Sequence, residues 1–353
     1  MITPKDMEKF SNNEVVKMYE KLNIDLSKTI IKKIESLGDV SSYTKSQIRT
    51  LQLQGGKDIF YKTLEKTSRL TAKQKREIIK LFNEISEQAM KGYTDVYKLK
   101  GLDYELSAEN IQLLDTIIKR TNTDLKNLTK SIAYAGQKDF IDGVDDLYKK
   151  VITGSYDYNT AMRQTSTSLA EKGVTLTTKD GRNEKIEVAV RRNLMTSIHQ
   201  TAQNIAKNVG DEIGANCVII GHSDKCRPTH HPIDAVTMSI KEFEKYEYLT
   251  EEPNCYHIVN YDWQPQFEDR RHKIEYDNEH QSYAETVKNY NIQQKARYYE
   301  RNVRQIKRAI ASGNDDKETR KRLRNAQAKL RIYNKTNGLP QDYARTWTPE
   351  YNK

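Results

Sequence analysis

The chain has 353 residues, of which 36% are hydrophobic and 31% charged, and its formal net charge is +10. This apolar share is low for a globular protein, so we expect a thin core and long solvated helices, or surfaces that await a partner. The apolar runs span only a few residues, whereas a bilayer span needs about 20, so we expect no membrane segment. The first residues, MITPKDMEKF, contain no apolar signal core, and three cysteines do not make a disulfide framework.

The positive charge is concentrated toward one end of the sequence. The stretch Glu268–Lys353 holds 20 Lys and Arg against 12 Asp and Glu, whereas residues 1–267 hold 39 against 37. A basic segment that follows a nearly neutral body indicates contact with a polyanion at that end.

Residues 1–155 form the first of three predicted regions and read as a series of helices. Apolar residues recur at helical spacing after Ser107, and Thr71-Ala-Lys-Gln74 matches a capping box, so we expect a helix to begin at each place. Gly55-Gly56 is interpreted as a turn between short helices. No catalytic motif or internal repeat is evident in this region.

Residues 156–268 are predicted to form a small α+β domain. Val174–Thr178 is rich in β-branched residues and predicts a strand, and the hairpin-turn dipeptide Asp180-Gly181 follows it. Apolar residues recur every three or four positions from Ile186 to Ile213, which predicts one long amphipathic helix. Further short elements are expected beyond it: a strand at Cys217–Ile220, a short helix capped by Ser239, and a strand at Ile258–Tyr261.

Residues 269–353 are predicted to form a basic helical hairpin, so the fold class is mainly α with a small α+β middle domain. Apolar residues between Ile292 and Ile310 alternate steps of four and three, which is typical of a coiled-coil seam, and a second helix is expected over about Asp315–Lys335. Between Lys295 and Lys335 there are 14 basic and 4 acidic residues, which favours phosphate contact, although a merely solvated basic face fits the pattern as well. The candidate nucleic-acid-binding side chains are Arg297, Arg301, Arg304, Lys307, Arg308, Arg320, Lys321, Arg322 and Arg324.

Four histidines and two cysteines fall within the 36 positions from His222 to His257. A structural zinc site needs four nitrogen or sulfur ligands, which often come as two short pairs from separate loops. Cys226-x3-His230 and Cys255-x-His257 are such pairs, so we predict that these four residues bind Zn²⁺, with His222 as an alternate ligand. Zinc would then contribute on the order of 10 kcal/mol to folding. The alternative is a set of buried cysteines and of histidines that hydrogen-bond the loops together.

Two enzymatic alternatives use the same cluster. Adjacent His230-His231, with Asp224 and Asp234 nearby, could serve a metal-dependent nuclease. A cysteine beside a histidine could act as a nucleophile. No H-E-x-x-H motif is present and no orienting motif surrounds either cysteine, so we expect a protein that is not an enzyme.

Over roughly residues 150–335 the chain resembles the phage minor capsid protein 2 family of phages that infect Gram-positive bacteria, and it is more distantly similar to the phage-Mu-type head morphogenesis proteins. The matching parts are the Gly181-Arg182 turn before the helix with Arg191 and Thr196, the segment with His222 and Arg227-Pro228-x-His230, the pair Cys255-x-His257, and the basic helix from Gln293 to Ala309. One departure follows the second part, where His231-Pro-Ile-Asp-Ala235 replaces an expected glycine and aromatic residue.

The resemblance implies a structural minor head protein that acts at the portal or the inner capsid surface in head assembly or DNA delivery. Its implied partners are the portal and capsid proteins, with packaged DNA as the polyanion. Its implied location is the virion, preceded by the host cytoplasm during assembly. No enzyme activity follows from the resemblance.

Overall fold

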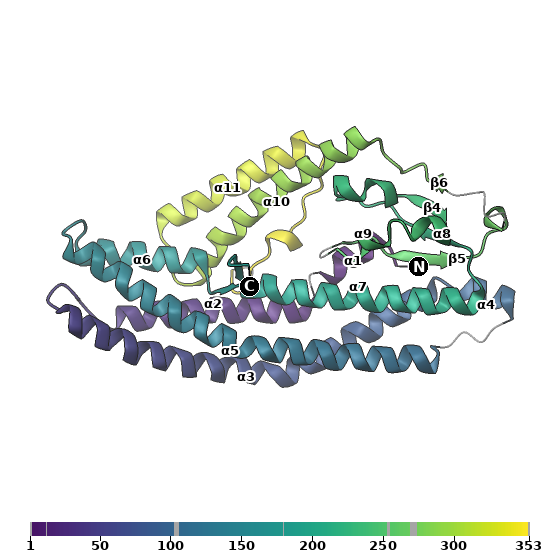
Figure 1. Ribbon diagram of the computed structural model, residues 1–353. Coiled ribbons are helices and arrows are strands. Elements are labelled where there is room, and N and C mark those ends of the chain that lie inside the picture. Colours follow the sequence, from purple (N-terminus) through teal and green to yellow (C-terminus); the bar gives the residue numbers. More distant parts are fainter. Residues whose placement is uncertain are drawn as a thin grey trace. The chain divides into compact units, whose positions relative to one another are not determined.

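The computed structural model describes residues 2–11, 13–101, 106–178, 180–252, 255–268 and 274–351, and it is mainly helical (Figure 1). The α-helices are α1 (Pro4–Phe10), α2 (Glu14–Glu35), α3 (Lys45–Lys91), α4 (Thr94–Lys100), α5 (Ala108–Ile152), α6 (Tyr158–Lys172), α7 (Ile186–Ile213), α8 (Ile240–Phe243), α9 (Glu247–Thr250), α10 (Tyr283–Ala311) and α11 (Lys317–Thr336). The strands are β1 (Thr175–Thr177), β2 (Asn183–Lys185), β3 (Cys217–Ile220), β4 (Val236–Ser239), β5 (Val259–Asp262) and β6 (Ile274–Tyr276). The 3-10 helices are η1 (Pro228–Ile233), η2 (Pro265–Phe267) and η3 (Ala344–Thr346). The predicted fold class, mainly α with a small α+β part, is confirmed.

The chain forms two compact units, each assembled from segments that are distant in the sequence. Unit 1 comprises Met1–Asn13, Lys75–Asp124 and Arg191–Lys295. Unit 2 comprises Glu14–Gln74, Leu125–Val190 and Ala296–Lys353. The boundaries fall inside α3, α5, α7 and α10, so each of these helices contributes residues to both units. The three regions expected from the sequence stay a prediction.

Unit 1 contains a four-stranded antiparallel sheet in the order β5-β3-β4-β6. The central strand β3 pairs with both neighbours, so that Val218 lies opposite Met238 on one side and Tyr261 on the other. Strands β3 and β5 lie where the sequence predicts strands, with β5 displaced by one residue. Strands β4 and β6 have no counterpart among the predicted elements, because their alternation of apolar and polar residues covers only four and three positions.

The long helix α7 begins and ends at the predicted residues. In unit 1 its apolar stripe is buried, and the fully buried members include Leu194, Ile198, Ala202, Ile205 and Val209. A Cβ on Gly210 would lie 2.4 Å from Cβ of Tyr261, so the missing side chain allows α7 to approach β5 closely. The helix ends at Gly214, whose φ of +66° is the left-handed conformation typical of a helix C-terminus.

In unit 2, α3 and α5 are much longer than the sequence suggests, and the predicted turn at Gly55-Gly56 is wrong. Both glycines lie inside α3, where a Cβ on Gly55 would come within 2.4 Å of the Phe140 ring. The glycine therefore allows close helix packing, which outweighs its poor helix propensity. The predicted helix start at Thr71-Ala-Lys-Gln74 is also wrong, because α3 continues through it and the buried Gln74 accepts a hydrogen bond from Tyr19 at 2.7 Å.

Other predicted elements of the chain are confirmed. Helix α5 begins after Ser107, whose hydroxyl accepts from the backbone N–H of Asn110 at 3.3 Å. Strands β1 and β2 form an antiparallel hairpin, in which Gly181 has a φ of +79°. Ser239 caps α8 by accepting from the N–H of Glu242.

The predicted helical hairpin is confirmed as α10 and α11. The chain turns at Gly313, with a φ of +111°, and Asp316 caps α11 by accepting from the N–H of Thr319 at 2.7 Å. Within the described residues, no helix combines the length and the apolar character that a membrane span requires.

Candidate metal centre

The cysteines and histidines of the predicted zinc site come from two loops beside the sheet of unit 1. The chain leaves β3, passes Cys226, and then forms the 3-10 helix η1, which contains His230. The second loop carries Cys255 and His257 just before β5. All four side chains are buried, with exposed fractions between 1% and 6%, so they converge in the interior of the unit rather than on its surface.

Cys255 lies at the middle of the cluster. Its Sγ is 3.5 Å from Nδ1 of His230 and 3.6 Å from Nδ1 of His257. These three ligand atoms all lie within 4.8 Å of one another. In a tetrahedral zinc site with Zn–S and Zn–N bonds of about 2.3 and 2.0 Å, sulfur and nitrogen lie about 3.5 Å apart. The observed spacings therefore fit shared coordination as well as they fit hydrogen bonds.

Both of these histidines use their other ring nitrogen to contact a carboxylate. Nε2 of His257 is 2.8 Å from Oδ1 of Asp234, and Nε2 of His230 is 3.0 Å from Oε2 of Glu252. An ionised carboxylate only accepts hydrogen bonds, so Nε2 is the donor in each contact and Nδ1 can carry a free lone pair. Metal-ligating histidines are commonly oriented in this way.

Cys226 joins the cluster through His257. Cys226, Asp234 and His257 place one ligand atom each within 4.8 Å of one another, and the Cys226 thiol makes a hydrogen bond with His257. Its Sγ also lies 3.3 Å from the carbonyl oxygen of Arg227. The structure thus brings the ligand atoms of His230, Cys255 and His257 together and places Cys226 in a second group, which shares only His257 with the first.

The alternate ligand, His222, occupies a different position. Its Nδ1 lies 2.8 Å from Oδ2 of Asp234, and it belongs to neither group of converging ligand atoms. The carboxylate of Asp234 therefore binds His257 through one oxygen and His222 through the other, while Oδ1 also accepts from the backbone N–H of Ser223. Asp234 ties the first loop to the second.

The electrostatics of the cluster follow from these contacts. Burial alone would raise the pKa of Cys255, but its hydrogen bonds with His199, His230 and His257 outweigh burial and lower the pKa to about 4. Burial likewise opposes ionisation of Asp234, yet its histidine partners lower its pKa to about 2. Burial dominates at Cys226 and raises its pKa. The deprotonated thiol of Cys255 is the form that binds a metal.

Sequence reasoning assigns no ligand-orienting role to three neighbours of the cluster, although it names Asp234 for the nuclease alternative. Asp234 and Glu252 supply the carboxylates, and His199 on α7 makes a hydrogen bond with Cys255 and donates from Nε2 to the carbonyl oxygen of His257 at 2.9 Å. His199 lies 56 positions before Cys255 and on a helix, so short spacing could not reveal it. Glu252, three positions before Cys255, and Asp234, four positions after His230, are closer and could have been weighed as ligand-orienting groups.

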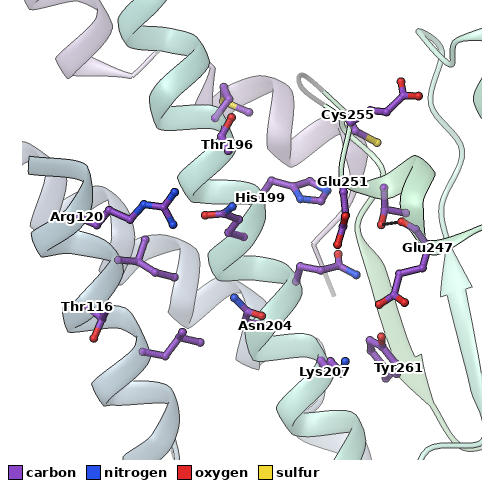
Figure 2. Close-up of a pocket in the computed structure, with 17 residues that line it drawn as sticks. Thr116, Arg120, Thr196, His199, Asn204, Lys207, Glu247, Glu251, Cys255 and Tyr261 are labelled. Carbon is purple, nitrogen blue, oxygen red and sulfur yellow. Dashed lines mark hydrogen bonds between the residues drawn. The ribbon is translucent and has the colours of Figure 1, made fainter. Parts of the chain in front are cut away.

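A hollow of about 710 Å³ in unit 1 borders the cluster on one side. Figure 2 shows Arg120 of α5 and His199 of α7 on one wall and Cys255 with Glu251 on the other. Cys255 is one of the residues that line this hollow.

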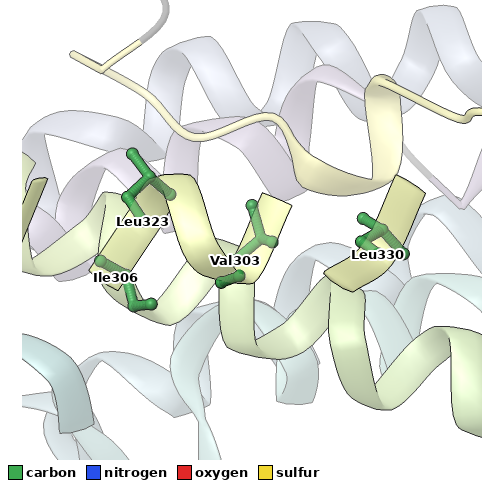
Figure 3. Close-up of a cluster of buried hydrophobic side chains, with 5 residues drawn as sticks. Val303, Ile306, Leu323 and Leu330 are labelled. Atoms are coloured by element: carbon green, nitrogen blue, oxygen red, sulfur yellow. The ribbon is translucent and has the colours of Figure 1, made fainter. Parts of the chain in front are cut away.

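The predicted nucleic-acid-binding residues lie on the helical hairpin of unit 2, and the structure divides them into two groups. A small core formed by Val303 and Ile306 of α10 and Leu323, Ala326 and Leu330 of α11 holds the hairpin together (Figure 3). Lys307 and Arg308 are buried on α10, where Lys307 donates to the carbonyl of Thr346 at 2.8 Å. The exposed members of the set are Arg301, Arg320, Lys321, Arg322 and Arg324, and the partly buried members are Arg297 and Arg304.

Comparison with known families matches residues 2–335 of the chain to the family described as phage minor capsid protein 2. The match covers nearly the whole chain, so the chain belongs to this family and is a structural protein of a phage head. A search of the curated proteins found no match, and neither did a search of the solved structures.

Proposed function

We propose that this head protein works without catalysis at the portal or the inner capsid surface, in head assembly or DNA delivery, and that a structural zinc ion holds together the two loops of unit 1. The single observation that carries the zinc proposal is the position of Cys255, whose Sγ faces Nδ1 of His230 and Nδ1 of His257 at 3.5 and 3.6 Å. Cys226, which makes a hydrogen bond with His257, would supply the fourth ligand, and such a set of nitrogen and sulfur ligands favours Zn²⁺ over the hard cations that prefer oxygen.

Four protein ligands would close the coordination sphere, so the ion would have a structural rather than a catalytic role. The ion would add to the contacts that Asp234 and Glu252 already make between the two loops. The hollow beside Cys255 would let a metal ion enter and a chelator remove it.

Thiol alkylation of the native protein tests this proposal with an internal control. Cys226 and Cys255 are expected to react slowly in the metal-loaded protein and much faster after treatment with a chelator. Cys217, buried in β3 and outside the cluster, should stay protected in both states. Unchanged reactivity of Cys226 and Cys255 after chelation would contradict a zinc site.

An inner location is supported by the family and by the basic hairpin, because packaged DNA is the polyanion inside a phage head. Protease treatment of purified particles tests this location. The protein should resist digestion in intact heads and be cut after the heads are opened by osmotic shock. Digestion in intact heads would place the chain on the outer surface.

DNA contact through α11 is supported by its exposed basic side chains, including Arg320, Lys321 and Arg324. Because such contacts neutralise phosphates without reading bases, affinity should fall by orders of magnitude between 50 and 200 mM salt if about six or more phosphates are contacted. A Lys321→Gln/Arg324→Gln variant should bind DNA more weakly, whereas Lys75→Gln/Arg76→Gln on the exposed side of α3 removes the same charge elsewhere. An equal loss of DNA affinity in both variants would argue against a DNA-binding surface on α11.

The alternative of a metal-dependent nuclease has less support, since both oxygens of Asp234 already bind histidines. An assay for cleavage of single-stranded and duplex DNA in the presence of added divalent metal decides between the nuclease and the structural protein. The structural proposal expects no cleavage. Cleavage that disappears in a His230→Ala variant would overturn it.

A further inference from the structure

Unit 2 contains a hollow of about 300 Å³ that is lined mainly by cationic and amide side chains. It lies where β2 runs into α7, against the face of α10 that carries the arginines. Four cations line it, Lys185, Arg301, Arg304 and Arg308, together with a single carboxylate, Glu187. The lining thus has a surplus of positive charge in a confined space.

Arg308 is the deepest of these cations, with 3% of its surface exposed. Its Nη2 donates to Oε1 of Glu187 at 2.6 Å, while Oε2 of Glu187 accepts from Asn23 at 2.8 Å. Among the described residues, neither Nε nor Nη1 of Arg308 meets a hydrogen-bond acceptor. Buried guanidinium donors without acceptors are costly, so an acceptor supplied from solution would stabilise this arrangement.

Lys185 adds to the crowding of positive charge. The pKa of its amine is lowered to about 7, mainly by burial and further by the charges of Arg308 and Arg304. The charge of Glu187 acts in the opposite direction. A negatively charged ligand would remove much of this repulsion. Lys185 immediately precedes α7, so the positive end of that helix dipole also faces the hollow.

We propose that this hollow is a binding site for a phosphoryl group, in which Arg308 and Lys185 contact the oxygens at the base and Arg301 and Arg304 contact them at the mouth. A doubly charged oxyanion balances the surplus of cations, and guanidinium groups match its geometry with paired N–H donors. Arg301 is exposed, so the mouth is open to solvent. The site lies in unit 2 and is independent of the metal centre and of the exposed face of α11.

Titration calorimetry of the full-length protein with inorganic phosphate, at constant ionic strength set with chloride, tests the site. Saturable binding to one site per chain is expected. Arg301→Gln and Lys185→Gln should each weaken it at least tenfold, since each removes a donor from the lining. Lys62→Gln removes one positive charge from an exposed position on α3, outside the hollow, and should leave phosphate affinity unchanged. Circular dichroism confirms that each variant is folded.

Absence of saturable binding, or an equal loss in Lys62→Gln and Arg301→Gln, would overturn the proposal. A short DNA duplex identifies the source of the phosphoryl group. If the duplex competes with phosphate and Lys185→Gln weakens duplex binding, the site takes a backbone phosphate. If Lys185→Gln weakens phosphate binding and leaves duplex binding unchanged, the site takes a small phosphate compound.

Discussion

The imidazole of His257 donates from Nε2 to Oδ1 of Asp234 across 2.8 Å, and both side chains are almost fully buried. This contact fixes the plane of the ring, so that Nδ1 faces Cys255 at 3.6 Å. The pair joins the loop that contains η1 to the strand that follows His257. The proposed zinc centre therefore depends on a carboxylate that is not itself one of the four ligands.

Replacement of Asp234 by asparagine should lower the zinc affinity of the protein by about 10-fold to 100-fold. The asparagine side chain is uncharged and has one oxygen, so it can no longer accept hydrogen bonds from both His257 and His222. The orientation of the His257 ring is therefore lost. Competition with a metal chelator measures the affinity. Asp224→Asn is the matched control, because Asp224 is exposed and its Oδ1 lies 3.4 Å from Nε2 of His222 rather than at His257. Equal effects of the two substitutions would show that Asp234 has no special role.

Arg308→Met should lower the free energy of unfolding by about 3–5 kcal/mol, because it leaves Glu187 buried without its charged partner. Urea denaturation measures the effect. In the double variant Glu187→Gln/Arg308→Met the loss should be smaller than the sum of the two single losses, since the second change removes the uncompensated charge. Additive losses would mean that the two side chains contribute independently.

The depressed pKa of Lys185 predicts a pH dependence of stability. Lys185 has a folded pKa of about 7, below its value in the unfolded chain, because burial and the charges of Arg308 and Arg304 outweigh the attraction of Glu187 and Glu20. The unfolded chain therefore binds more protons between pH 7 and about 10, so this residue makes stability rise with pH in that window, by up to about 1.4 kcal/mol per pH unit.

Urea denaturation of the wild type and of Lys185→Met at pH 7, 8 and 9 isolates this contribution. The advantage of the methionine variant should be largest at pH 7 and shrink as pH rises. A difference that is constant over this range would show that Lys185 titrates normally.

Leu330→Ala should destabilise the hairpin by about 2–5 kcal/mol, because Leu330 is 2% exposed and belongs to the core shared by α10 and α11. Ile332→Ala on the same helix is the matched control, since Ile332 is 66% exposed and its loss should have little effect. Thermal denaturation compares the two variants. Similar losses would contradict the packing of α10 against α11.

Much of the fold could be predicted because its strongest patterns are local. The apolar stripe of α7 and the four–three seam of α10 each extend over several turns, so the buried face is visible in the sequence. The turn assigned to Gly55-Gly56 failed for a nonlocal reason, namely the ring of Phe140 from α5. A glycine that allows close packing cannot be distinguished from a turn glycine without its distant partner.

The candidate site shows the same limit. Cys226, His230, Cys255 and His257 stand out because soft ligands are clustered within a short stretch. His199 does not stand out in the sequence, because α7 and the β5 strand that follows His257 become neighbours only in the folded chain. The burial of Lys307 and Arg308 was equally hidden, because their charge alone suggests solvent or DNA and their partners lie far away in sequence.

Metal analysis of the full-length protein, purified without added metal or chelator, tests the central claim most directly. The account predicts about one zinc ion per chain in the wild type and in the Cys217→Ser control, and strong depletion in Cys255→Ser. A metal-free wild-type protein, or a Cys255→Ser variant that keeps its zinc, would contradict it.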